Sequence, residues 1–339
     1  MPRKGIFWNG DEKRLRSFWR LTIQGVAWVA LVVILQAIIE TIAILIAVAE
    51  GTISQEMLSN LTILERLLLR SPLVVLGLKF SELLVTLGTV WLAGRLLDRR
   101  RFVDFGFRFD KNWWIDLGFG LFLGAFSFAL IFAVERAAGW LTVTGTFVTR
   151  NPSVPFPITI LLPLLIFIMV GIEEELFSRG YQLTNLAEGL NWKRIGPRGA
   201  IVLATVGSSV FFGLLHGINP NATLVSTLNL MVAGLALATG YVLTGELAIP
   251  IGYHIAWNFF QGNVFGFQVS GMDFRSATFI AIRQGGPELW TGGAFGPEAG
   301  LLGLGMDVLG IALIVLWVWL RYRRFGLHAP IAEPPDRPA

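Results

Sequence analysis

The chain has 339 residues, of which 54% are hydrophobic, and its mean hydropathy of +0.65 excludes an ordinary water-soluble globular protein. Its net charge is +4 at pH 7, and we attribute this basic excess to cytoplasmic loops of a membrane protein rather than to nucleic acid binding. Cysteine is absent, which excludes disulfides, cysteine zinc ligands and a thiol nucleophile.

The apolar runs predict an all-α polytopic membrane protein with about eight transmembrane helices in one domain, residues 21–320. A basic, cytoplasmic segment (1–20) precedes the first run, which is too long for a signal peptide and has no cleavage pattern. A proline-rich tail (321–339) is expected to be disordered, and the segments 136–155 and 268–299 are expected to be loops. The predicted helices cover residues 21–49, 73–96, 113–134, 156–170, 200–216, 224–243, 247–267 and 300–320.

The distribution of lysine and arginine predicts that both termini are cytoplasmic. Eight spans place both ends on one side, and the loops on the other side are poorer in Lys and Arg for their length. We therefore expect a multi-pass protein of the plasma membrane of a prokaryote, surrounded by membrane lipids. The basic segments that fall on the cytoplasmic side are 1–20, 95–111, 179–198 and 321–324.

Three adjacent carboxylates, Glu173, Glu174 and Glu175, directly follow the apolar run before them. A charge at the middle of a membrane helix costs roughly 2.5–3.5 kcal/mol on insertion scales. Glu175 and Arg179 are four residues apart, a spacing that pairs opposite charges on one helix face. Glu174 then lies about 100° around the helix and is left to face a cavity. The sequence equally allows a helix end at the water interface, with Arg179 neutralising the acids.

Two further helices carry polar side chains at helical spacing. Phe212 and His216 are four apart on the fifth helix, as are His254 and Asn258 on the seventh. A lone histidine in a membrane helix more often forms a hydrogen bond between helices than takes part in catalysis. Two histidines, an asparagine and an acidic cluster on three helices indicate a functional site.

Together these residues form three motifs, Glu174-Glu175-x-x-x-Arg179, Phe212-x-x-x-His216 and His254-x-x-x-Asn258. In order and rough spacing they resemble the signature motifs of the CPBP family, which comprises the type II CAAX prenyl endopeptidases and their bacterial relatives, also called the ABI family. The resemblance covers about residues 95–265. The spacing to the arginine selects the second and third acids as the family pair, which leaves Glu173 as an extra acid.

The resemblance implies an intramembrane endopeptidase that hydrolyses a peptide bond with glutamate-activated water. Glu174 would be the general base, assisted by His216. His254 and Asn258 would hold the water or stabilise the oxyanion. The other motif residues would have supporting roles: Glu175 and Arg179 would order the site, and Phe212 would contact substrate.

The use of a metal ion is left open by the sequence. No His-Glu-x-x-His zinc helix is present, yet Glu174, His216 and His254 are residue types able to hold a divalent metal such as Zn²⁺ with an open position. The expected substrate is a peptide or protein tail, with or without a lipid. No nucleic acid partner is expected.

The catalytic groups meet only if the fourth helix continues beyond the acidic cluster. A helix cut at Glu174 would leave this acid at the cytoplasmic face and His216 at the outer face. Continued to Ala187, the helix places Glu174 about 20 Å above its cytoplasmic end. We therefore predict a long, tilted fourth helix and a polar, water-filled cavity that opens to the cytoplasm.

Two other functions are compatible with the sequence. One is a non-proteolytic membrane scaffold or bacteriocin-immunity-type protein of the same fold, although the intact motif residues favour the protease. The other is a transporter with an ion path through Glu40, Lys79 and Glu82, but no inverted repeat supports it. Lys79 and Glu82 are three residues apart and are predicted to neutralise each other. Glycines in the helices predict close helix packing, within or between chains.

Overall fold

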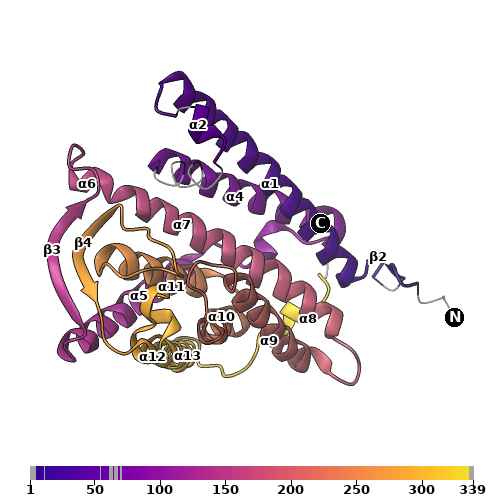
Figure 1. The fold of residues 1–339 in the computed structure, drawn as a ribbon. Helices are drawn as coiled ribbons and strands as arrows, with labels where there is room; N and C mark the ends of the chain where they lie inside the picture. Colours follow the sequence, from indigo (N-terminus) through magenta and orange to yellow (C-terminus); the bar gives the residue numbers. More distant parts are fainter. Residues whose placement is uncertain are drawn as a thin grey trace.

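The structure is a computed structural model that describes residues 5–10, 12–53, 55–60, 64, 68 and 71–335. In this part of the chain, long helices form a bundle with a two-stranded sheet at one end and both termini at the other (Figure 1). Seven of the described helices are long and apolar enough to cross a membrane, which confirms the all-α polytopic membrane fold. Their main α-helical parts are α1 (Ser17–Ala49), α4 (Pro72–Ala93), α5 (Lys111–Ala137), α7 (Leu161–Glu175), α9 (Gly196–His216), α10 (Leu224–Thr244) and α13 (Leu301–Tyr322).

Side-chain caps fix where two of these helices begin. The Asp110 carboxylate accepts a hydrogen bond from the Trp113 backbone N–H at the start of α5. At the start of α10, Thr223 and Ser226 each bond the backbone N–H of the other. These bonds satisfy N–H groups that lack a partner within the helix. Gly245, in the left-handed conformation, ends α10 and turns the chain towards α11.

The fourth span is one continuous helix of 35 residues, Phe156–Leu190, which agrees with the long helix predicted. It begins with α6 (Phe156–Thr159) and α7, passes through a π-helical stretch (Leu176–Leu183) and ends with α8 (Thr184–Leu190). It runs diagonally through the middle of Figure 1. The π-helical stretch starts directly after the acidic cluster, and such local widening of a helix is frequent at functional sites.

The predicted seventh helix is shorter than the sequence indicated. It comprises α11 (Ala248–Phe259) and a π-helical turn (Phe260–Val264), so it ends three residues early and is too short to count as a span. Every residue of α11 up to Asn258 is buried, and the helix packs against α5, α7 and α10. A helix that is buried on all sides need not be long enough to span the bilayer, because its apolar surface packs against other helices rather than lipid.

The contact between α5 and α11 brings the two backbones together. A Cβ atom added to Gly120 or Gly124 of α5 would collide with backbone atoms of α11, including the Tyr253 N and Trp257 N atoms. One added to Gly252 of α11 would collide with the Leu117 carbonyl in return. These glycines therefore serve packing within the chain, where small residues let membrane helices approach closely.

Replacing Gly252 by alanine is expected to lower the stability of the protein by about 1–3 kcal/mol, because the added methyl group overpacks this contact. Thermal unfolding in detergent measures the effect. Gly118→Ala is the matched control, since nothing lies within 4 Å of a Cβ added there, and it should cause no loss. An equal loss in both variants would contradict the packing argument.

Two segments predicted as loops contain strands, so that prediction is wrong for part of each. β3 (Leu141–Thr149) pairs antiparallel with β4 (Ala277–Gln284), with an irregularity between Val143 and Gly145. β-Branched and aromatic residues in these segments favour a strand. The sheet holds the α5–α6 and α11–α13 connections on one side of the bundle (Figure 1), as the predicted order of spans requires.

At the opposite end of the bundle, buried ion pairs join distant parts of the chain. The Glu188 side chain is 3% exposed. Its carboxylate oxygens lie 2.7 Å from Nη2 of Arg14, 2.8 Å from Nη2 of Arg20 and 2.5 Å from Nη2 of Arg100. Arg20 also pairs with Asp98 at 2.6 Å. Basic residues that the sequence indicated as cytoplasmic loop charges are thus buried and paired with acids far away in sequence.

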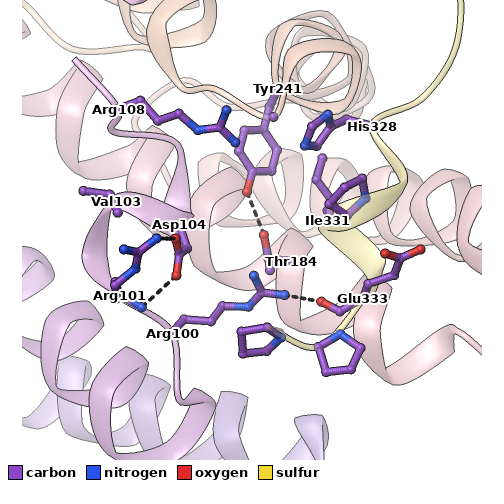
Figure 2. A pocket seen from close by; sticks show the side chains of 14 residues that line it. Arg100, Arg101, Val103, Asp104, Arg108, Thr184, Tyr241, His328, Ile331 and Glu333 are labelled. Carbon is purple, nitrogen blue, oxygen red and sulfur yellow. Dashed lines mark hydrogen bonds and ion pairs between the residues drawn. The ribbon is translucent and has the colours of Figure 1, made fainter. Parts of the chain in front are cut away.

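The tail was expected to be disordered, but residues 325–335 lie against this same end, while 336–339 fall outside the described residues. The His328 backbone N–H donates to the Val242 carbonyl at 2.8 Å, and Ile331 is buried. Arg100 donates to the Glu333 carbonyl at 2.5 Å. Figure 2 shows the tail forming one wall of a cavity of about 620 Å³.

Candidate functional site

The acidic cluster lies near the middle of the 35-residue helix, where α7 passes into the π-helical stretch. This position excludes the alternative that the cluster marks a helix end at the water interface. The three acids face different surroundings: Glu175 is fully buried, Glu173 is buried towards α4, and the Glu174 side chain keeps 29% of its surface exposed. Glu174 is therefore the acid best placed to meet a substrate or water.

His254 on α11 lies between two of these acids. Its Nδ1 atom is 2.8 Å from Oε1 of Glu175, and its Nε2 atom is 4.0 Å from Oε2 of Glu174. The Glu175 carboxylate is an acceptor, so the Nδ1 atom carries a proton and donates it in this bond. The Nε2 atom is thereby directed towards Glu174.

Arg179 bonds the same carboxylate oxygen of Glu175. Its Nη1 atom donates to Oε1 of Glu175 at 3.0 Å, which confirms the predicted i,i+4 pair. Its Nη2 atom donates to the Gly234 carbonyl of α10 at 3.3 Å, and its guanidinium carbon lies 4.4 Å from the centre of the Phe212 ring. A buried charge with an ion pair, a further hydrogen bond and a cation–π contact is well compensated.

His216, the last residue of α9, is oriented by its own helix. Its Nδ1 atom lies 2.8 Å from the Phe212 carbonyl oxygen. A carbonyl only accepts, so Nδ1 is the donor and Nε2 is the nitrogen left for other partners. Together with His254 and Asn258, His216 lines a cavity of about 40 Å³. Phe212 lines it as well but is buried under Arg179, so in this structure it supports the site more than it offers a free surface.

Two acids that were not predicted from the sequence, Glu298 and Asp307, line the same cavity, and we call them its acidic wall. Glu298 precedes α13, and Asp307 lies within α13; both line the cavity. Glu298 accepts hydrogen bonds from the Ser270 backbone N–H and from Trp257 Nε1, the latter at 3.4 Å. Asp307 is 2% exposed, and its Oδ2 atom has no hydrogen-bond partner among the residues that the structure describes. One signal was present: Asp307 is an acid inside a predicted membrane helix, and such residues are commonly functional.

The extra acid, Glu173, belongs to a separate polar group on the α1–α4 side. Lys79 and Glu82 form the predicted ion pair at 2.6 Å, and Gln36 of α1 donates to Glu82 at 2.6 Å. Glu173 lies beside this pair. The pair is thus neutralised within the bundle, as the sequence indicated.

The three candidate metal ligands do not converge on one point in this arrangement. Each histidine has only Nε2 available for a metal, because Nδ1 of His254 is engaged by Glu175 and Nδ1 of His216 by the Phe212 carbonyl, a pattern that by itself is compatible with metal binding. Throughout the described part of the chain, no three His, Cys, Asp or Glu side chains converge as possible ligands of one metal ion. The prediction that Glu174, His216 and His254 hold a metal is not supported.

Comparison with known proteins finds a family model that matches this part of the chain. Residues 156–260 match the family model of the type II CAAX prenyl endopeptidases, Rce1-like. The matched segment runs from α6 to the end of α11 and contains all three motifs. No curated protein and no solved structure matches the chain. The match over residues 156–260 confirms the CPBP resemblance of the motifs.

Proposed function

We propose that the protein is an intramembrane endopeptidase in which Glu174 activates a water molecule. The observation that carries this proposal is the position of His254 between Glu174 and the Glu175–Arg179 pair. The 4.0 Å between His254 Nε2 and Glu174 Oε2 is too long for a direct hydrogen bond. It suits one water molecule bonded to both groups. Such a water is held beside a carboxylate that can accept its proton.

In the proposed reaction, Glu174 takes a proton from this water while the water oxygen attacks the carbonyl carbon of the peptide bond. His216, with Nε2 free, assists Glu174. The oxyanion that forms is stabilised by the Asn258 amide and by protonated His254 donating through Nε2. Glu175 fixes the orientation of the His254 ring through Nδ1, which restricts the ring to productive geometries.

We further propose that the substrate, a peptide or protein tail with or without a lipid, enters from the side that carries the basic segments. The positive-inside rule assigns that side and both termini to the cytoplasm, here of a prokaryotic plasma membrane. One observation is consistent with this direction of entry. Ser270 and Glu298 of the α11–α13 connection line the cavity, and this connection lies on the same side of the bundle as the sheet, opposite the basic segments.

Cleavage of a library of prenylated and plain peptides by the detergent-purified protein tests the proposal. His254→Ala is expected to abolish cleavage, because it removes the group that holds the water and the oxyanion. His328→Ala is the matched control, since His328 lies in the tail against α10, and it should retain activity. Because the three candidate ligands do not converge, we expect the same cleavage in EDTA.

Three outcomes of this assay would count against the proposal. No cleavage by a folded wild-type protein, over both kinds of peptide, would favour the non-proteolytic scaffold. Equal activity of wild type and His254→Ala would place the chemistry elsewhere. Loss of cleavage in EDTA that Zn²⁺ restores would show that the site rearranges to bind a metal.

A further inference from the structure

We propose that Glu298 and Asp307 form a subsite for the amino group that peptide-bond hydrolysis releases. This inference rests on the proposed protease function and extends it. It assigns a binding role to two residues outside the three motifs, which line the same cavity as His254 and Asn258. The ligand class is a primary ammonium group at the new amino terminus of a product peptide.

Asp307 is the cavity residue whose carboxylate lacks a hydrogen-bond partner in the described part of the chain. Its side chain is 2% exposed on a membrane-spanning helix, and the structure gives Oδ2 no partner within the described residues. A buried carboxylate without a partner costs several kcal/mol. Asp307 lines the cavity beside His254 and Asn258. A polar or cationic group in the cavity would supply the missing contact.

Glu298 is held in place by contacts on several sides. Its carboxylate accepts hydrogen bonds from the Ser270 N–H and from Trp257 Nε1. Its backbone carbonyl accepts a bond from Asn229 of α10 at 3.3 Å. These contacts connect the segment before α13 to α10 and α11. Glu298 is therefore fixed in position before a ligand binds. This favours binding, because little conformational freedom is lost when the ligand arrives.

The two walls of the cavity match the charges that develop during hydrolysis. The carbonyl oxygen becomes negative and would be met by His254 and Asn258. The nitrogen becomes positive when it is protonated before the C–N bond breaks, and again in the released ammonium group, and it would be met by Glu298 and Asp307. The cavity volume of about 40 Å³ exceeds the roughly 10–15 Å³ that a cavity needs to hold one water molecule. It therefore admits an ammonium group.

The step balances without any further reactant. The water oxygen bonds to the carbonyl carbon, Glu174 passes the proton it took from water to the nitrogen, and the C–N bond of the protonated intermediate then breaks. The products at this point are a carboxylic acid and an amine. The acid then gives its proton to the amine, which leaves a carboxylate and an ammonium group. The subsite stabilises this ammonium group and its precursor in the transition state.

A peptide and an ester of the same sequence separate this role from a structural one. Ester hydrolysis releases an alcohol, which carries no positive charge. Asp307→Asn should lower kcat/KM for the peptide by about tenfold, which is 1.4 kcal/mol, and leave the ester within about twofold. Asp116→Asn is the control, because Asp116 bonds Trp317 and Tyr322 of the same helix α13 outside the cavity. It should affect both substrates equally.

A binding measurement provides a readout that does not need catalysis. In the Glu174→Gln protein, fluorescence anisotropy would compare a labelled product peptide with a free amino terminus and its acetylated form. We expect the free amine to bind about tenfold more tightly, and Asp307→Asn or Glu298→Gln to remove this preference. If the wild type hydrolyses neither substrate, the protease function fails and this binding result alone decides the subsite. Equal binding of both peptides, or an equal loss of peptide and ester hydrolysis in Asp307→Asn, would overturn the proposal.

Discussion

Glutamine in place of Glu174 is expected to lower kcat/KM for peptide cleavage by roughly 10²–10⁴-fold, since an amide cannot accept a proton from water. The same change should leave the thermal unfolding temperature nearly unaltered. The Glu174 side chain is 29% exposed, and its ion pair with His254 is long at 4.0 Å, so glutamine removes only a weak contact. Cleavage assays and thermal unfolding of one preparation would measure both effects.

The neighbouring acids supply matched controls with different expected results. Glu175→Gln removes the charge that Arg179 and His254 contact, and breaking a buried pair typically costs about 3–5 kcal/mol. It should therefore lower both stability and activity. Glu173→Gln, beside the Lys79–Glu82 pair, should leave kcat/KM within about twofold. An equal loss of activity at all three positions would mean that the cluster is structural and that Glu174 has no special role.

Removal of the charge at Glu188 is expected to produce the largest loss of stability. Glu188→Gln leaves Arg14, Arg20 and Arg100 buried around a neutral side chain. Truncating one partner of a buried ion pair typically costs about 3–5 kcal/mol, because the remaining charges stay desolvated. Thermal or denaturant unfolding in detergent would measure the loss.

Glu246→Gln is the control for this prediction. Nε of its partner Arg108 lies 2.8 Å from Glu246 Oε1, and the Arg108 side chain is 61% exposed. Ion pairs with an exposed partner contribute about 0–1 kcal/mol to stability. A Glu188 variant as stable as the Glu246 variant would show that the arginines find other partners or water. The comparison thus tests whether burial, rather than the number of ion pairs, determines what this end of the bundle contributes.

The sequence predicted the helices and the meeting of the three motifs because both depend on patterns along the chain. Long apolar runs specify spans whatever they pack against. His254 and Asn258 share a helix face by spacing alone, and Glu175 and Arg179 do so as well. The family resemblance then indicated that these faces converge. The contact of His254 with Glu175 agrees with this expectation.

Patterns along the chain could not predict the acidic wall or the burial of the arginines. Hydropathy cannot distinguish an arginine in a cytoplasmic loop from one such as Arg20, which pairs with an acid on a distant helix. Asp307 lies alone in its helix, without a motif partner at helical spacing, so its neighbours appear only in three dimensions. The length of α11 was overestimated for a related reason. Its length is determined by burial among other helices rather than by the thickness of the bilayer.

The pairing of β3 with β4 has a consequence for how the protein assembles in the membrane. The two strands are separated by α10 and by the three helices that carry the motifs, so the sheet can close only after the chain through Gln284 has been inserted. Contacts between residues so far apart in sequence form late, because the loop between them must first be closed. The sheet therefore closes over helices that already carry all three motifs. An insertion intermediate that lacks β4 would hold all three motifs without the connection that bounds the cavity.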